Sequence, residues 1–512
     1  MRAELITDFK KCRIRGGSLL EILIALALLS LSLSASALLV FANQSLKADS
    51  ITQNEALNKI GKVLEEARAI SRFDFTQLLT LGTSTDDIYQ KSLFVRDKTP
   101  CLKEATGYIS WSTEALRPQK IKLRTALGNM PEAFALGGDC DSEISGDWDN
   151  PSTYGAIDLA PSGIQGNDVK ASRRGTDRFA FIASSASSPA KPDFWIINAT
   201  DAQNPSISSS VETGPGLNAI DVAYDNASGK YFAYAANDDL IDQLQIIDTT
   251  DTANPVLVAA MTLPGVTGSC PSTCPGGRSI YYYDKKVYVG THRLVGGAKH
   301  ELHIYDVSNP LSPNWLGSKK IDHNVNAIIV RDNWAYLATS DNDGEVIILN
   351  VSDPTNIPDP TSGPGDGTKF DAADTPSNIG EDGTALYLLG GKLYLGRERA
   401  PSSRPDFYVL DIADPESVPA LGSKNLGINP NTEITGIVVS AERAFIATTD
   451  STGGFQVWNI ADPSNIILQS SCSIYNYSEK ATGIDFVDNL GFISNESNKA
   501  LRIIYDQPSI CI

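Results

Sequence analysis

Three acidic side chains near residue 343 are the clearest candidates for binding a metal ion. Asp341, Asp343 and Glu345 alternate along the segment DNDGE, in which Gly344 precedes the last of them. Oxygen ligands at alternate positions before a glycine turn are typical of the start of a calcium loop. The same residues also fit the tip of an ordinary β-hairpin, which is the preferred interpretation. We therefore predict no metal site, and Asp341, Asp343 and Glu345 stand only as weak calcium candidates.

Histidine and cysteine offer little further chemistry. The four histidines all lie between residues 292 and 323, and the segment HELH has two residues between its histidines, whereas the zinc motif HExxH has three. The segment CPSTC could be a redox pair or half a metal site, but no second cysteine pair has matching spacing. No nucleophile elbow, phosphate-binding loop or dinucleotide fingerprint is present. We predict that the protein is not an enzyme and carries no cofactor.

The charge balance excludes another class of function. The 512 residues include 42 Lys and Arg against 61 Asp and Glu, a net charge of −19. Broad binding to phosphates needs clustered cations, so general nucleic-acid binding is not expected. A chain of this length exceeds one ordinary domain and predicts a large repeat domain or several smaller ones.

The N-terminus holds the only long apolar run. No charged residue occurs from Ile22 to Leu46, and residues 1–16 carry a net charge of +3. At about 1.5 Å per residue, a helix over this run crosses a bilayer core of roughly 30 Å. A positive flank stays cytoplasmic, which predicts a single-pass inner-membrane precursor with its C-terminal domain outside. A plain signal anchor or a cleaved signal peptide is the alternative.

The segment Arg15-Gly16-Gly17-Ser18-Leu19-Leu20-Glu21, followed by the apolar run, resembles the signal of type IV prepilins and pseudopilins. The resemblance implies that a prepilin peptidase cuts between Gly16 and Gly17 and that the new N-terminus is methylated. Glu21 then becomes the fifth mature residue, as in the family, whereas the first is Gly where the family usually has Phe. The implied role of Glu21 is to pair with the N-terminal amine of a neighbouring pilin subunit during assembly. The implied final location is a pilus or the cell surface.

A membrane-proximal module is expected after the leader. Residues 17–72 predict one helix, because apolar residues recur at three- and four-residue spacing past the membrane run. Residues 73–136 predict a small sheet, with short strands at 92–95, 107–111 and 120–125, that resembles the module of minor pilins. Residues 137–154 are turn-rich and acidic and are interpreted as a linker.

Residues 155–512 repeat one unit seven times. Each unit has an apolar strand with a central aromatic, then a second strand of the type LQIID, and six units continue with Asx-Pro. The aromatics are Phe181, Tyr234, Tyr288, Tyr336, Tyr394, Phe445 and Phe492. Seven units of about fifty residues fit a seven-bladed β-propeller, closed by residues 156–159 in the last blade. The unit resembles the LVIVD repeat family; a β-helix is the alternative architecture.

Cysteine usage predicts disulfides once the prepilin resemblance is accepted. Cleavage after Gly16 removes Cys12 and leaves six cysteines in a domain outside the cytoplasm, where disulfides form. Six cysteines allow 15 connectivities. Position along the chain favours the pairs Cys101–Cys140, Cys270–Cys274 and Cys472–Cys511.

Together these features predict a fold class and a function. The fold class is a long N-terminal α-helix with a small α+β pilin-like module, followed by an all-β seven-bladed propeller. The predicted function is a minor type IV pilin-like subunit whose extracellular propeller serves in adhesion or partner binding, with an unidentified protein or glycan as ligand. The alternatives are a pseudopilin of a secretion or DNA-uptake system that recruits cargo, and a membrane-tethered propeller enzyme. Fold alone does not choose among them.

Overall fold

The structure is a computed structural model that separates into two compact units, residues 1–132 and 133–512. Each unit is considered separately below. The structure describes residues 19–73, 78, 80–99, 102–112, 118–128, 144–159, 163–185, 191–225, 227–238, 241–266, 276–293, 299–372, 381–398 and 404–507.

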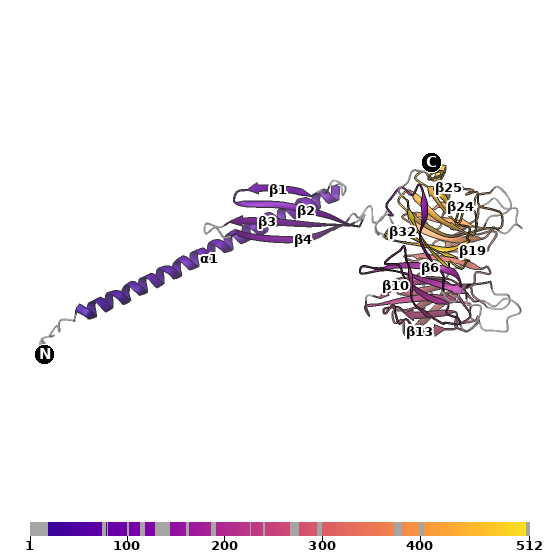
Figure 1. Cartoon of the computed structure of the whole chain (residues 1–512), viewed down its shortest axis with the longest axis horizontal. Helices are drawn as coiled ribbons and strands as arrows, with labels where there is room; N and C mark the ends of the chain where they lie inside the picture. Colours follow the sequence, from indigo (N-terminus) through magenta and orange to yellow (C-terminus); the bar gives the residue numbers. More distant parts are fainter. Residues whose placement is uncertain are drawn as a thin grey trace, which may run out of the picture. The chain divides into compact units, whose positions relative to one another are not determined.

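The first unit begins with helix α1 (Leu19–Phe73), which has 55 residues (Figure 1). Its described side chains at residue 24 and residues 26–40 are all exposed. Further along, Ala56, Ile60, Leu64 and Ala67 recur at three- and four-residue spacing and are buried. The helix is therefore apolar and uncovered in its first half and amphipathic in its second.

The second half of α1 packs on a four-stranded antiparallel sheet, whose order is β1-β2-β3-β4. The strands are β1 (Leu81–Asp86), β2 (Tyr89–Thr99), β3 (Leu102–Ser112) and β4 (Pro118–Gly128). The sheet contributes Leu93, Ala105 and Leu127 to a core shared with Leu64 of the helix. Gly107 lets the helix approach, because a Cβ there would lie 2.5 Å from Cδ1 of Ile60.

The second unit consists of seven antiparallel sheets over its described residues, which we call blades 1 to 7 (Figure 1). Blades 1 and 2 contain β6 (Gln165–Arg174), β7 (Asp177–Ser185), β8 (Phe194–Asn198), β9 (Ser206–Val211), β10 (Leu217–Asp225), β11 (Lys230–Asn237), β12 (Leu244–Asp248) and β13 (Val256–Met261). Blades 3 and 4 contain β14 (Gly277–Tyr283), β15 (Lys286–Thr291), β16 (Leu302–Asp306), β17 (Asn314–Lys319), β18 (Val325–Arg331), β19 (Trp334–Thr339), β20 (Val346–Asn350) and β21 (Gly367–Phe370). Blades 5 and 6 contain β22 (Gly383–Leu389), β23 (Lys392–Arg397), β24 (Phe407–Asp411), β25 (Ala420–Lys424), β26 (Ile434–Ser440), β27 (Arg443–Thr448), β28 (Phe455–Asn459), β29 (Ile467–Leu468) and β30 (Ile474–Tyr475), with the short helix η1 (Pro463–Asn465) before β29. Blade 7 contains β31 (Ala481–Val487), β32 (Leu490–Asn495), β33 (Leu501–Asp506) and β5 (Pro151–Ile157).

Blade 7 closes the ring by joining the two ends of the unit. Strand β5, which comes first in the chain, pairs antiparallel with β33, which comes last, so that Arg502 faces Ala156. The predicted closure in the last blade is confirmed, although the strand covers 151–157. Closure of this kind covers the outer edge of β33 and joins the last blade to the start of the unit.

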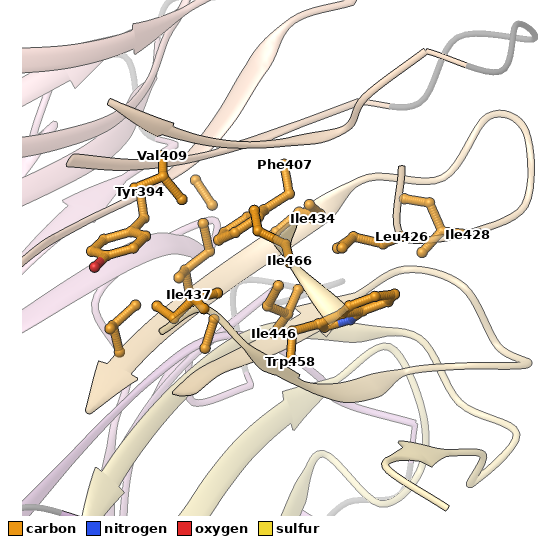
Figure 2. Close-up of a cluster of buried hydrophobic side chains, with 14 residues drawn as sticks. Tyr394, Phe407, Val409, Leu426, Ile428, Ile434, Ile437, Ile446, Trp458 and Ile466 are labelled. Atoms are coloured by element: carbon orange, nitrogen blue, oxygen red, sulfur yellow. The ribbon is translucent and has the colours of Figure 1, made fainter. Parts of the chain in front are cut away.

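The core lies between neighbouring blades. Tyr394 and Phe407 of blade 5 pack with Ile437, Ile446 and Trp458 of blade 6, as Figure 2 shows. Equivalent clusters fill the other boundaries, and the seven repeated aromatics predicted from the sequence are all buried. Burying one large apolar side chain contributes about 1.5–3 kcal/mol, so these clusters stabilise the ring.

The predicted fold class needs correction. Over the described residues the chain is mostly β-structure, arranged in eight antiparallel sheets of four or five strands. The first unit holds a complete four-stranded meander with strands of up to 11 residues, where we predicted three short ones. The strands are longer than the apolar segments 92–95, 107–111 and 120–125, because the alternation of side chains between the helix side and solvent continues beyond these segments.

The segment 144–150 belongs to the propeller, although the predicted linker was 137–154. Trp148 is fully buried, with its ring centroid 5.1 Å from that of Phe445 and 5.5 Å from that of Phe486. The backbone N–H of Ile144 donates to Ser440 Oγ of blade 6 at 2.8 Å. We call residues 144–150 the entry segment, because they dock on blades 6 and 7 just before β5.

The localisation prediction is also corrected. Within the described residues, no helix combines the length and the hydropathy that a membrane span requires. A single-pass inner-membrane precursor is therefore not supported.

Candidate functional site

The central channel of the propeller is the candidate site. A cavity of about 490 Å³ lies between the innermost strands of all seven blades, β6, β10, β14, β18, β22, β26 and β31. All seven strands carry an irregularity near their first residues, which shifts the register against the second strand of the blade. Side chains at and after this point line the cavity.

A ring of hydrogen bonds at the irregularity joins each blade to the next. In each case a side chain of one inner strand donates to a backbone carbonyl at or just before the next inner strand, at 2.7–3.1 Å. The donors are Asn167, Asn218, Ser279, Asn326, Thr384, Thr435 and Thr482, and the acceptors are Leu217, Gly277, Val325, Gly383, Ile434, Ala481 and Gly166. The last link returns from blade 7 to blade 1, so the ring is complete.

A second ring of lining residues is chemically uneven. Aligning the inner strands by their irregularities places one residue from each blade in the same position of the cavity wall. In order of the blades these residues are Lys170, Asp221, Tyr281, Ile329, Tyr387, Val438 and Asp485. Blades 7, 1 and 2 therefore line the cavity with charged groups, whereas blades 4 to 6 present apolar and aromatic ones.

Three aspartates bridge consecutive blades on the charged side. Asp168 accepts from the N–H of Val169 at 2.8 Å and from that of Ile220 in blade 2 at 2.9 Å. Asp221 bonds to its own strand and to Tyr282 of blade 3, and Asp485 to its own strand and to Ala171 of blade 1. These bonds fix the carboxylates in the cavity wall.

Burial sets the protonation of this side of the channel. Burial raises the pKa of Asp168 to about 6, against the opposing effects of the Lys170 charge and two backbone N–H groups. The pKa of Asp485 is also raised by burial. Burial acts against the charged form of Lys170, but the negative charges of Asp221, Asp485 and Asp168 outweigh it and raise the Lys170 pKa. Lys170 is therefore cationic at neutral pH.

A further cation, Arg278, lines the cavity beside the hydrogen-bond ring. Its Nε donates to Asn326 Oδ1 at 2.6 Å. Burial lowers the pKa of Arg278, whereas the charges of Glu433, Asp382 and Asp238 act in the opposite direction. Burial raises the pKa of both Asp382 and Glu433. Acidic groups from several blades thus compensate the positive charge of Arg278.

The three weak calcium candidates do not converge in the structure. Asp341 accepts from Lys369 Nζ at 2.6 Å, Asp343 is exposed, and Glu345 is fully buried. Glu345 Oε1 accepts from Arg397 at 2.7 Å, and its other oxygen accepts from the N–H of Ala372 at 3.0 Å. Cations therefore already occupy two of the three carboxylates. Among the described residues, no group of three or more metal-ligating side chains could hold an ion.

The remaining predicted site residues are only partly described. Gly16, Gly17, Cys101, Cys140, Cys270, Cys274 and Cys511 lie outside the described residues. Glu21 lies in α1, but its side chain is not described. Cys472 is disulfide-bonded, and its pairing with Cys511 stays a prediction.

The channel residues are not among the site residues predicted from the sequence. Lys170 and Asp485 are more than 300 positions apart in the sequence, and only closure of the ring brings them together. One signal was present: the inner strands GNDVK and TGIDF place charges between apolar residues, where other repeats have AIIV or TGIVV.

Comparisons with known proteins agree with the repeat architecture. LVIVD repeats are found at residues 293–320 and 324–358. Among solved structures, the crystal structure of BamB from Moraxella catarrhalis is similar at a TM-score of 0.40 and 10% identity, covering 71% of this chain and 99% of that one. No curated protein matches the chain. The chain therefore contains LVIVD repeats within its propeller.

Proposed function

We propose that the protein is a pilin-like subunit that assembles through α1 and carries the propeller as a binding head. The observation that carries the proposal is the exposure of the apolar half of α1. Ile24, Leu31 and Leu38 are 51%, 68% and 70% exposed, and their neighbours on every side of the helix are equally uncovered. A helix that is apolar all round needs to be buried, and helices of other copies offer a matching surface.

The N-terminal segment supports the same proposal through its resemblance to prepilins. Cleavage by a prepilin peptidase between Gly16 and Gly17 would free an amine four residues before Glu21. In a bundle of such helices, Glu21 would pair with the amine of a neighbouring subunit, which compensates a charge that apolar side chains cannot. The proposed partners are thus the peptidase and other pilin subunits.

The propeller supports a role in binding rather than catalysis. Its residues 133–512 include 24 Lys and Arg against 47 Asp and Glu, a net charge of −23. Such a charge disfavours nucleic acid as the ligand. The cavity combines fixed carboxylates, cations and aromatic side chains, a composition that suits recognition of a polar ligand. We propose a protein or a glycan as that ligand.

The test is co-expression of the full chain with a prepilin peptidase and its filament system. We expect intact mass and N-terminal sequencing to show a mature chain that starts at Gly17, and immunoelectron microscopy to show the propeller in filaments. Gly16→Ala should abolish cleavage, whereas Gly82→Ala, at an open position of the sheet module, should not. An uncut wild-type chain would refute the proposal.

A further inference from the structure

Two polar groups that line the channel have no hydrogen-bond partner among the described residues and are open to the cavity. Among the described residues, neither the ammonium of Lys170 nor the hydroxyl of Tyr281 makes a hydrogen bond or an ion pair. Lys170 interacts with the three aspartates only through longer-range electrostatics. An ammonium has three donors and a phenol one, so the wall offers up to four unused donors to the cavity.

The same wall also offers acceptors. Each oxygen of Asp221 and Asp485 accepts one backbone N–H, and a carboxylate has about four lone-pair sites, so both groups keep acceptor capacity. Their positions are fixed by those backbone bonds. A ligand that both donates and accepts would therefore meet a preorganised set of partners.

The opposite wall offers an apolar face. Blades 4, 5 and 6 contribute Ile329, Tyr387 and Val438 at the positions where blades 1, 2 and 7 contribute charges. A bound molecule would contact charged and polar groups on one side of the channel and aromatic or aliphatic groups on the other.

The balance of charges restricts the class of ligand. The lining residues include the cations Lys170 and Arg278 against the anions Asp168, Asp221 and Asp485. Because three carboxylates stand against two cations, the charges of the wall nearly balance, and neither an anionic nor a cationic ligand gains a clear electrostatic advantage. A neutral molecule with several hydroxyls and one apolar face avoids the cost of burying a charge. A pyranose sugar has these properties.

We propose that the channel of the propeller binds a neutral saccharide, with Lys170 and Tyr281 donating to its hydroxyls and Asp221 and Asp485 accepting from them. Tyr387 packs against the apolar face of the ring. The cavity of about 490 Å³ is of the size of a small-ligand pocket and holds roughly one or two sugar rings. This inference rests on the proposed function of the propeller as a binding head and names the chemistry of its ligand.

The experiment is isothermal titration calorimetry of the full chain with a panel of neutral saccharides: glucose, galactose, mannose, N-acetylglucosamine, lactose and maltose. We expect at least one to bind. Lys170→Met should weaken that binding about tenfold or more, because it removes a hydrogen bond from a charged group. Tyr281→Phe should weaken it about two- to tenfold, because the bond it removes joins two neutral groups. The controls are Lys230→Met and Tyr224→Phe, which change exposed side chains outside the channel and should leave affinity unchanged.

Two results would overturn the inference: no saccharide of the panel binds the folded wild-type chain, or both channel variants bind as tightly as the wild type. Tyr281→Phe keeps the test decisive if Lys170→Met does not fold, because it removes only a hydroxyl. Cleavage at Gly16 and incorporation into filaments are measured on the same protein. If these succeed and no sugar binds, the saccharide inference fails alone; if cleavage and incorporation fail, the proposed function fails.

Discussion

Replacement of Trp148 by alanine should destabilise the propeller strongly, because the entry segment is part of its core. The indole is fully buried, and its ring centroid lies 5.1 Å, 5.5 Å and 6.3 Å from the ring centroids of Phe445, Phe486 and Phe455. Its Nε1 donates to the carbonyl of Ser145 at 3.0 Å, which holds the entry segment in a turn. Truncating a buried tryptophan costs about 3–5 kcal/mol through lost burial and the cavity left behind.

The assay is urea unfolding of the full chain, followed by far-ultraviolet circular dichroism so that loss of a tryptophan does not alter the signal. We expect Trp148→Ala to lower the free energy of unfolding of the propeller by about 3–5 kcal/mol. Trp315→Ala is the matched control, because Trp315 lies on β17 of the same propeller and is 44% exposed. Its loss should cost less than about 1 kcal/mol. Equal losses for the two variants would show that the entry segment is not part of the core.

Two further predictions concern buried charges. Burial raises the pKa of the Asp168 carboxyl to about 6, so the folded state binds a proton at Asp168 more tightly than the unfolded chain does. The stability gained from this protonation is fully present below about pH 4 and is lost as the pH rises through 6. Asp168→Asn should therefore flatten the decline in unfolding free energy between pH 4 and pH 7, measured by urea titration at each pH, and an unchanged slope would contradict the assignment. Arg397 donates to Glu345 at 2.7 Å and to Glu381 at 2.8 Å in a fully buried site. Arg397→Met should cost about 3–5 kcal/mol, because it leaves the buried carboxylate of Glu345 without a cation and leaves Glu381 with only Arg404 at 3.7 Å. Adding Glu345→Gln and Glu381→Gln should restore much of the loss in the same thermal or urea assay, and a triple variant no more stable than the single one would refute the ion-pair explanation.

The sequence predicted the blades because each blade depends on local patterns. Two consecutive apolar segments such as FAFIA and FWIIN form an antiparallel strand pair, and the aromatic at the centre of the first segment is buried between blades. The closing strand was predictable for a related reason: the last repeat ends at β33 without an outer strand, and the first residues of the unit supply one.

The channel and the entry segment were not predictable in the same way. Asp485 of blade 7 meets Lys170 of blade 1 only when the ring closes, and no local pattern encodes that closure. The entry segment ISGDWDN has the composition of a linker, because its turn-forming and acidic residues outnumber the apolar Ile144 and Trp148. A lone large aromatic within a polar stretch was the available signal, since such a side chain is rarely left in solvent.

Closure of the ring in blade 7 has a mechanical consequence. The chain enters the propeller at the entry segment and β5, so tension applied between the helix and the propeller acts first on this segment and on the pairing of β5 with β33. The other six blades are held by their own strands and by the ring of cross-blade bonds, outside the direct line of load. Blade 7 is thus where the chain attaches to the propeller, and Trp148 has to leave the core before β5 can be pulled away from β33.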